Sequence, residues 1–235
     1  MEKFKRFGVI GAMEIEVSRL KEIMDIKNTE SHASMEFCEG TYAGKDVVAV
    51  RSGVGKVNAA LCTQILIDRF GIDAIINTGV AGSLNAEINI GDMVVSTDAV
   101  QHDVDATVFG YEYGEVPQLG KTSFEADKEL RALAVLACRE AAPDVGVFEG
   151  RVLSGDQFIS DPEVKKTIKE RFSGLCTEME GAAIAQAADL SGIPYVILRA
   201  ISDKADGSDI VDYPVFEAKA ADDCVKIVLR MLEKA

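Results

Sequence analysis

Residues 177–203 read TEMEGAAIAQAADLSGIPYVILRAISD. Residues 181–191 would be small and apolar on nearly every side of a helix. A surface helix alternates an apolar face with a polar one, so this segment predicts a buried helix. An apolar run of strand length follows at 195–201. A buried helix that leads into a buried strand is typical of proteins in which helices cover a parallel or mixed sheet.

The same alternation of apolar strands and helical patterns extends over the rest of the chain. Further strands are predicted at 7–11, 35–42, 46–50, 74–78, 93–96 and 147–153, with 35–42 and 46–50 joined as a hairpin. Further helices are predicted at 14–26, 57–70, 126–140, 162–171 and 215–233. Because no linker, repeat or low-complexity tract interrupts the sequence, we expect an α/β fold. It should be a single-domain three-layer α/β/α sandwich around a central mixed β-sheet, with one domain spanning residues 1–235.

The composition narrows the classes of partner. The chain carries a formal net charge of −14 over 235 residues, and its longest runs of Lys or Arg contain two residues. Nucleic acids and acidic membranes are bound by basic surfaces, so we expect neither as a partner. Small molecules and further copies of the same chain are the expected partners.

The cysteine and histidine content bears on metal sites and on the compartment. Five scattered cysteines without a CxxC pair, together with two histidines, predict reduced thiols and no metal site. The sequence shows neither a signal peptide nor an apolar run of about 18 residues. These features predict a soluble cytoplasmic protein.

Acidic side chains lie next to the buried elements. Glu178 and Glu180 flank Met179 directly before the buried helix. Free backbone N–H groups and the helix dipole favour an ionised acid there, so Glu180 is expected to be a charged carboxylate at the mouth of a site. The alternative is a helix-capping acid without a chemical role.

The strand at 195–201 carries two further charged residues. Side chains alternate along a strand, so Arg199 and Asp203 share one face and lie at its carboxyl end, where open α/β sheets bind ligands. The alternative is an Arg–Asp ion pair, which at about 13 Å along a strand would require a bend.

Glu16 follows the first predicted strand. Glu16, Leu20 and Ile23 recur at helical spacing, so Glu16 borders an apolar stripe. A carboxyl group that is partly buried has a raised pKa and suits a general base near neutral pH. The alternative for Glu16 is an ordinary surface acid.

Several turns after strands are rich in glycine, which lets a flat ligand approach the backbone. The turns at 52–56 and 77–83 match neither a dinucleotide motif nor a Walker motif, and 154–159 is a further turn at a strand end. Phe158 in the last turn is a candidate for stacking on a heterocycle, although packing in the core is the commoner role of a Phe. A long aromatic-rich segment at 101–122 is expected to be functional or covered by a partner.

Taken together, these segments resemble the bacterial 5′-methylthioadenosine/S-adenosylhomocysteine nucleosidases, within the purine nucleoside phosphorylase superfamily. The similar segments cover nearly the whole chain in the order of the family: GVIGAMEIE (8–16), NTGVAGS (77–83), HDVD (102–105), FGYEYG (109–114), SGDQF (154–158), EMEG (178–181) and RAISD (199–203). The resemblance implies a nucleoside phosphorylase-like fold. It also implies hydrolysis of adenine nucleosides with a 5′-alkylthio group, in methionine salvage and the recycling of methylation products, without a cofactor.

The resemblance also implies roles for single residues. Glu16 would be the general base on the attacking water, and Asp203, oriented by Ser202, would protonate adenine N7. Glu180 would hold the ribose hydroxyls, with Arg199 helping to hold the water and the ribose.

Other residues are implied in substrate binding. Those expected to line the pocket of their own chain are Ala12, Met13, Val54, Val80, Ala81, Gly82, Phe158, Ile159, Glu178, Met179, Ser202 and Tyr213. Those expected to reach the 5′ group in the site of the neighbouring subunit of a homodimer are Ala106, Phe109, Tyr111 and Pro117. Some relatives carry Ser where this chain has Val80, so a hydroxyl contact to the water is not expected there.

Three other functions are considered. A phosphorolytic enzyme would need an anion pocket, whereas Glu16 would repel an anion and no Arg cluster lies beside it in the sequence. Futalosine or aminofutalosine hydrolysis would use the same cleavage on a different 5′ group. A non-catalytic nucleoside-binding protein would not need Glu16, Glu180 and Asp203 together.

Overall fold

Within the residues that the structure describes, ten strands form one mixed sheet. This computed structural model describes residues 4–204 and 213–235, with the backbone but not the side chains of residues 213–218. The strands are β1 (Arg6–Gly11), β2 (Asp25–His32), β3 (Met35–Tyr42), β4 (Lys45–Arg51), β5 (Ala74–Ser83), β6 (Met93–Gln101), β7 (Ser123–Glu125), β8 (Val147–Ser154), β9 (Cys176–Glu178) and β10 (Tyr195–Asp203). Their order in the sheet is β10-β6-β8-β9-β5-β1-β4-β3-β2, and β7 pairs with β6.

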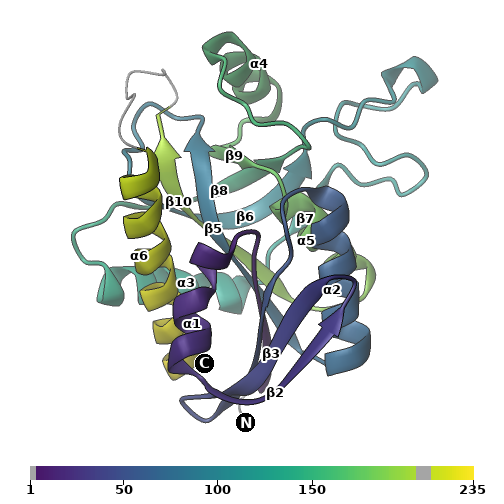
Figure 1. Cartoon of the computed structure of the whole chain (residues 1–235). Helices are drawn as coiled ribbons and strands as arrows, with labels where there is room; N and C mark the ends of the chain where they lie inside the picture. The colour runs from purple at the N-terminus through teal and green to yellow at the C-terminus, as the bar shows by residue number, and fades with distance from the viewer. Residues whose placement is uncertain (1–3, 205–212) are drawn as a thin grey trace.

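Helices cover both faces of this sheet (Figure 1). They are α1 (Ser18–Ile23), α2 (Lys56–Phe70), α3 (Lys128–Ala141), α4 (Pro162–Phe172), α5 (Gly181–Leu190) and α6 (Tyr213–Lys234), with 3₁₀ turns η1 (Glu14–Glu16) and η2 (Thr107–Phe109). α1, α3 and α6 pack on one face, and α2 and α5 pack on the other. This arrangement confirms the predicted α/β sandwich around a mixed sheet.

Alternation of side chains along the strands supplies both cores. In β1, Phe7 and Val9 enter the core under α1, α3 and α6, whereas Ile10 enters the core under α2 and α5. The central strands are apolar on both faces because both faces are covered. α4 stands at the end of the sheet, where Ile168 and Phe172 pack in a third, smaller cluster.

The sheet splits at β5, and this split positions the site. β5 pairs with β1 over Ala74–Asn77, and farther along it pairs with β9 at Gly82 and Ser83. On its other side it pairs with β10. Since β10 also pairs with β6, the sheet closes on itself through β10, β6, β8, β9 and β5. The sequence did not predict this closure.

The segment after β1 differs from the prediction. Residues 14–26 were expected to form one helix, but they form η1 and the short helix α1, and the chain then enters β2. Glu16 and Leu20 of the expected stripe are buried, whereas Ile23 is 42% exposed. β2 was missed because its residues are almost all exposed, so the strand has no buried face to produce an alternating pattern.

The sequence also predicted reduced cysteine thiols and no long apolar segment. Each of the five cysteines, all within the described residues, is a buried free thiol. Burial raises the pKa of each thiol, which keeps them unreactive: Cys38, Cys62, Cys138, Cys176 and Cys224. Among the described residues, no helix combines the length and the apolar character that a membrane span requires.

Candidate active site

A cavity opens where β5 parts from β1. Its lining comes from segments that follow β1, β4, β8 and β9 and from the carboxyl halves of β5 and β10. The residues that line it are Ala12, Met13, Glu16, Val54, Val80, Ala81, Gly82, Gln157, Phe158, Ile159, Thr177, Glu178, Met179, Glu180, Ser202 and Asp203. The fold therefore brings into one cavity residues that are as far apart in sequence as Ala12 and Asp203.

Glu16 is held at the inner end of this cavity by backbone groups. Its side chain accepts hydrogen bonds from the N–H groups of Ala12 at 2.6 Å, Met13 at 2.9 Å and Val80 at 3.2 Å. The residue is 2% exposed. Burial raises the pKa of the Glu16 carboxyl, against the opposing effects of Arg199 and the three N–H groups. The raised pKa expected from the sequence is found, and it suits a group that takes a proton from water.

Glu178, which lines the cavity, forms a buried ion pair with Arg199. Both side chains are almost wholly buried. Ser154 donates a hydrogen bond to Glu178, and the Gly181 N–H donates to both carboxylate oxygens of Glu178 at 2.8 and 3.0 Å. Arg199 also donates to the Asn77 side chain at 2.7 Å. The ion pair thus joins β5, β8, β9 and β10 to the beginning of α5.

Glu180 differs from the prediction of a carboxylate that the N–H groups of the helix terminus keep ionised. The free N–H groups at the start of α5 bind Glu178, and Glu180 accepts a bond from the Gly55 N–H at 2.9 Å instead. Burial and the neighbouring Glu178 charge raise the pKa of the Glu180 carboxyl from 4.5 to about 7. The sequence pointed to the right helix terminus, but it could not show which of the two acids the N–H groups would bind.

Gly79 lets these groups meet. A Cβ atom at this position would lie 2.3 Å from the Arg199 Nη1 atom and 2.3 Å from the Glu16 Oε1 atom. Any side chain there would therefore force the carboxylate and the guanidinium away from the backbone of β5. As a result, the carboxyl groups of Glu16, Glu178 and Glu180 surround the single guanidinium of Arg199.

Asp203 occupies the other end of the cavity, and among the described residues it is paired with Lys165 and with no Arg. Its Oδ1 atom accepts a hydrogen bond from the Ser202 hydroxyl at 3.1 Å, and its Oδ2 atom lies 2.5 Å from the Lys165 ammonium. The side chain is 27% exposed, towards the cavity. The ion pair considered from the sequence joined Asp203 to Arg199, but Arg199 pairs with Glu178 instead.

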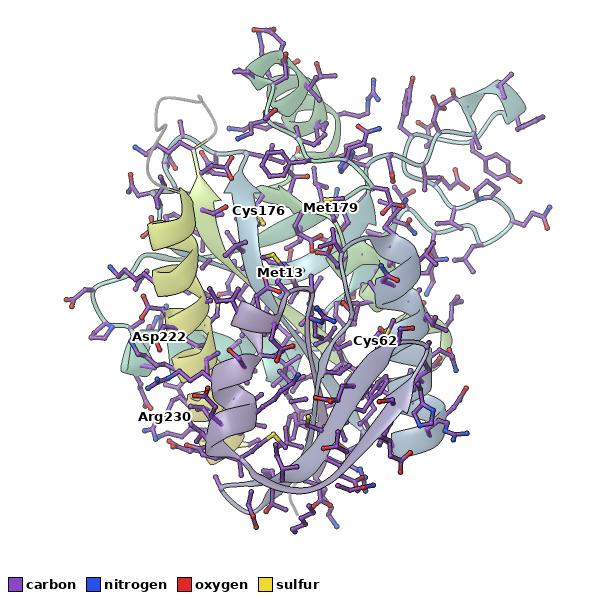
Figure 2. The ribbon with its side chains drawn as sticks, in the orientation of Figure 1. Met13, Cys62, Cys176, Met179, Asp222 and Arg230 are labelled. Atoms are coloured by element: carbon purple, nitrogen blue, oxygen red, sulfur yellow. The ribbon has the colours of Figure 1, made fainter. Side chains whose placement is uncertain are left out.

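Apolar side chains complete the walls of the cavity between its two charged ends. Figure 2 shows Met13 and Met179 near the centre of the molecule, and both line the cavity. Phe158 is 71% exposed at the cavity, so it is not the core residue that was considered as the alternative. An acid at one end, carboxyl groups at the other and apolar walls between them suit a flat, uncharged molecule with a polar part at each end.

Comparison with known proteins places this arrangement in a family. Residues 6–233 match the Phosphorylase superfamily. A 5′-methylthioadenosine/S-adenosylhomocysteine nucleosidase from Bacillus thuringiensis is 42% identical over 230 residues, which are 97% of this chain and 99% of that protein. The chain therefore belongs to the 5′-methylthioadenosine/S-adenosylhomocysteine nucleosidase family.

Solved structures of relatives share the fold over almost their whole length. The nucleosidase from Neisseria meningitidis, in complex with methylthio-immucillin-A, has a TM-score of 0.92 and 39% identity, covering 98% of this chain and 100% of that one. A futalosine hydrolase of Helicobacter pylori has a TM-score of 0.91 and 32% identity, covering 99% of each chain. The same fold is thus found in a 5′-methylthioadenosine/S-adenosylhomocysteine nucleosidase and in a futalosine hydrolase.

Some residues that the nucleosidase resemblance implied lie outside the cavity. Arg199 is buried behind it, in contact with Glu178. The side chain of Tyr213 and residues 207–212 lie outside the described part of the chain. The four residues expected to serve a neighbouring subunit do not line the cavity of their own chain: Ala106, Phe109, Tyr111 and Pro117. They lie on the segment that projects from the body of the protein (Figure 1).

Other contacts in the nucleosidase site were not predicted. Gln157 and Thr177 line the cavity, and Asn77 and Lys165 hold Arg199 and Asp203. Asn77 lies in the motif NTGVAGS and Gln157 in the motif SGDQF, so the sequence could have identified both as site residues. Lys165 had no such signal. Among the described residues, no cluster of His, Cys, Asp and Glu is arranged to hold a metal ion.

The Glu180 contacts lead to a prediction about stability. Because the folded nucleosidase binds the Glu180 proton more tightly than the unfolded chain does, the free energy of unfolding should fall as the pH rises from 4.5 to about 7. Glu180→Gln replaces the carboxyl group that binds this proton with an amide that does not titrate. The variant should therefore gain stability relative to wild type as the pH rises through this window, and keep the gain above it. Unfolding midpoints in urea, measured between about pH 5 and pH 9, provide the test.

Glu22→Gln, which removes an exposed acid of α1, is the matched control for the loss of one negative charge. It should show no comparable dependence on pH. A Glu180→Gln protein that is less stable than wild type at the alkaline end would show that the folded state favours the charged form of Glu180.

Proposed function

We propose that this chain hydrolyses the N-glycosidic bond of 5′-methylthioadenosine and S-adenosylhomocysteine, and also of 5′-deoxyadenosine, releasing adenine and the 5-substituted ribose. The observation that carries the proposal is the charge arrangement around Arg199. Three carboxyl groups surround this one guanidinium, and among the described residues that line the cavity there is no Lys or Arg. Such a site stabilises a positively charged sugar and disfavours a phosphate anion.

Breaking the bond moves electrons from the sugar onto the base. The C1′–N9 bond pair goes to adenine while positive charge develops on the ribose. Asp203 donates a proton to adenine N7, which neutralises the charge on the leaving base. Ser202 orients the Asp203 carboxyl through its hydrogen bond of 3.1 Å.

The sugar is attacked by water at the opposite end of the cavity. The Glu16 carboxylate, fixed by three N–H groups, accepts a proton from the water as its oxygen bonds to C1′. This division between an acid and a base resembles that of inverting glycosidases. The backbone N–H of Val80 positions Glu16, and the Val80 side chain supplies no hydroxyl to the water.

Other side chains hold the substrate in place. Glu180 binds the ribose hydroxyls, Met179 packs on the sugar, and Arg199 supports the ribose end through Glu178 and Glu180. Phe158 stacks on adenine, whose edge is read by the backbone of Ile159. The remaining contacts come from Ala12, Met13, Val54, Ala81, Gly82 and Tyr213.

The working unit in this proposal is a homodimer of single-domain chains. The outer sides of α2 and α5, which pack together, expose Val57 at 76%, Leu61 at 44% and Leu190 at 59%. On the projecting segment Phe109 is 81% exposed. A second copy on this face would cover these apolar groups and receive Phe109 near its 5′ subsite. The protein would act in the cytoplasm without a cofactor, consistent with its free thiols.

Hydrolysis of futalosine or aminofutalosine is the second candidate function. A relative with this activity shares the fold at a TM-score of 0.91. The cleavage would be the same, and the difference would lie in the 5′ group, which residues of the second subunit would contact. A phosphorylase and a non-catalytic binding protein fit the carboxyl groups around Arg199 less well.

The first functional prediction is turnover without phosphate. Purified protein should release free adenine and a reducing 5-methylthioribose from 5′-methylthioadenosine in phosphate-free buffer, because the cavity favours water over an anion. Chromatography of the products, with and without added phosphate, is the measurement. A phosphate requirement, or a sugar 1-phosphate as product, would contradict the proposal.

The second prediction concerns the acid. Asp203→Asn keeps the shape of the side chain but removes the proton, so kcat should fall about 10²–10⁴-fold while substrate affinity changes much less. Steady-state kinetics and binding of 5′-methylthioadenosine give the two quantities. Near-normal kcat would mean that another group protonates adenine.

The third prediction concerns Phe109. Phe109→Ala should lower kcat/KM for 5′-methylthioadenosine by the loss of about 1.5–3 kcal/mol of apolar contact, and should lower it less for adenosine, whose 5′-hydroxyl gains little from an apolar wall. Steady-state assays of wild type and variant with each nucleoside separately measure the two losses in kcat/KM. Equal losses would argue against contact with the 5′ group.

A mixed dimer tests whether Phe109 serves the other subunit. If one subunit carries Phe109→Ala and the other Glu16→Gln, one site holds both defects and the other holds neither. About half of the wild-type activity should then remain. If Phe109 serves its own site, each site carries one defect and activity should drop well below half.

A further inference from the structure

Lys165 is a buried cation on α4 that the proposed mechanism does not use. Its side chain is 4% exposed, and its ammonium group lies 2.5 Å from Asp203 Oδ2 and 2.9 Å from the carbonyl oxygen of Lys204. Burying an ammonium group is costly unless it is paired and hydrogen-bonded. The partners of Lys165 therefore account for its position.

The position of Lys165 on its helix is otherwise an apolar one. Lys165, Ile168 and Phe172 recur at helical spacing and are the buried residues of α4, whereas Lys166 and Lys169 are exposed. Ile168 and Phe172 attach α4 to the end of the sheet. An apolar residue would complete that stripe at lower cost, so the packing of α4 does not explain a lysine there.

The contact with Lys165 helps to fix the Asp203 carboxyl group. One carboxylate oxygen is held by Lys165, while the other accepts from Ser202, so the plane of the carboxyl group is set from both sides. A Cβ atom on Gly82 would lie 2.9 Å from Asp203 Oδ2, so the backbone of β5 closes the side behind it. The carboxyl group is thereby fixed at the wall of the cavity.

We propose that Lys165 is the positioning residue for the acid of this nucleosidase, holding the Asp203 carboxyl in place and stabilising the carboxylate that remains after proton transfer. The inference rests on the proposed function. Asp203 first takes up a proton from water; in the step, this O–H bond breaks, the proton bonds to adenine N7, and the C1′–N9 electron pair passes to the base. The new carboxylate forms beside the Lys165 ammonium, which favours the transfer.

The role differs from that of a latch that only closes the empty cavity. A latch would compete with adenine for Asp203, and its removal would strengthen substrate binding or raise kcat/KM. A positioning residue acts on the chemical step, so its removal should lower kcat and leave KM nearly unchanged.

A double-mutant cycle between Lys165 and Asp203 tests the proposal. Lys165→Met retains the apolar stem and removes the charge, and kcat for 5′-methylthioadenosine should fall about 10- to 100-fold, the range for a hydrogen bond to a charged group. Lys165→Arg should retain most of the activity. In an Asp203→Asn background, Lys165→Met should change kcat less than about twofold, because the residue acts through Asp203.

One variant controls for the loss of a charge on α4, and another replaces Lys165→Met if that variant does not fold. Lys166→Met removes an exposed charge from the next position of the same helix and should leave kcat unchanged. Lys165→Gln serves as a second charge-removing variant should Lys165→Met fail to fold, as judged by circular dichroism and the unfolding midpoint.

The outcomes separate this inference from the proposed function. Unchanged or increased kcat in both charge-removing variants, or an equal loss in the wild-type and Asp203→Asn backgrounds, would overturn the role of Lys165. If the wild-type protein releases no adenine, or Asp203→Asn is fully active, the proposed function or its acid fails first. Loss of activity in Lys165→Arg as severe as in Lys165→Met would also count against the proposal, because the charge is kept.

Discussion

The buried ion pair between Glu178 and Arg199 is the contact on which the rest of the site depends. Taking two charges out of water is costly, and the cost is offset here because both partners are hydrogen-bonded from several directions. Ser154 and the N–H groups of α5 satisfy Glu178, while Asn77 satisfies Arg199. These partners belong to four strands and one helix, so the ion pair holds together the elements that line the cavity. Removing the Arg199 charge would leave the Glu178 carboxylate buried without its cation, a loss of about 3–5 kcal/mol.

The charges around this pair explain how one cavity can hold both a base and an acid that act on the same bond. At the inner end, Glu178 takes the helix N–H groups and most of the attraction of Arg199. Burial raises the pKa of both the Glu16 and the Glu180 carboxyl groups, and the Glu178 charge adds to the effect on Glu180. Glu180, with a pKa of about 7, exchanges protons near neutral pH, and ionised carboxyl groups at this end favour positive charge on a sugar. Asp203 instead has its own cation in Lys165, whereas Glu16 and Glu180 share Arg199 with Glu178. Acid and base chemistry on one bond requires such a separation of environments.

Much of the fold followed from local patterns. Strands buried on both faces and the small-residue helix at α5 have strong periodicity, and they begin within one residue of the predicted positions. β5 and β6, however, continue five residues beyond their predicted ends. Weakly buried or very short elements were missed, among them β2, which is almost fully exposed, and β9, which spans Cys176–Glu178. The site residues on motifs at strand ends were found for a physical reason, since the carboxyl ends of neighbouring strands meet. Lys165 was not found, because a lysine in a charged amphipathic helix looks like any surface residue until the helix is placed.

The sequence by itself determined the α/β class, the order of the main elements and the residues from which the site is built, because hydrophobic periodicity and glycine turns are local properties of the chain. The tertiary structure alone decided which acid takes the helix N–H groups, which cation pairs with Asp203, and where the sheet closes on itself. These depend on contacts between residues far apart in sequence: Arg199 meets Asn77 and Glu178, and Lys165 meets Asp203. Protonation states follow from such contacts, since burial and neighbouring charges set the pKa of a carboxyl group and neither is fixed until the chain has folded.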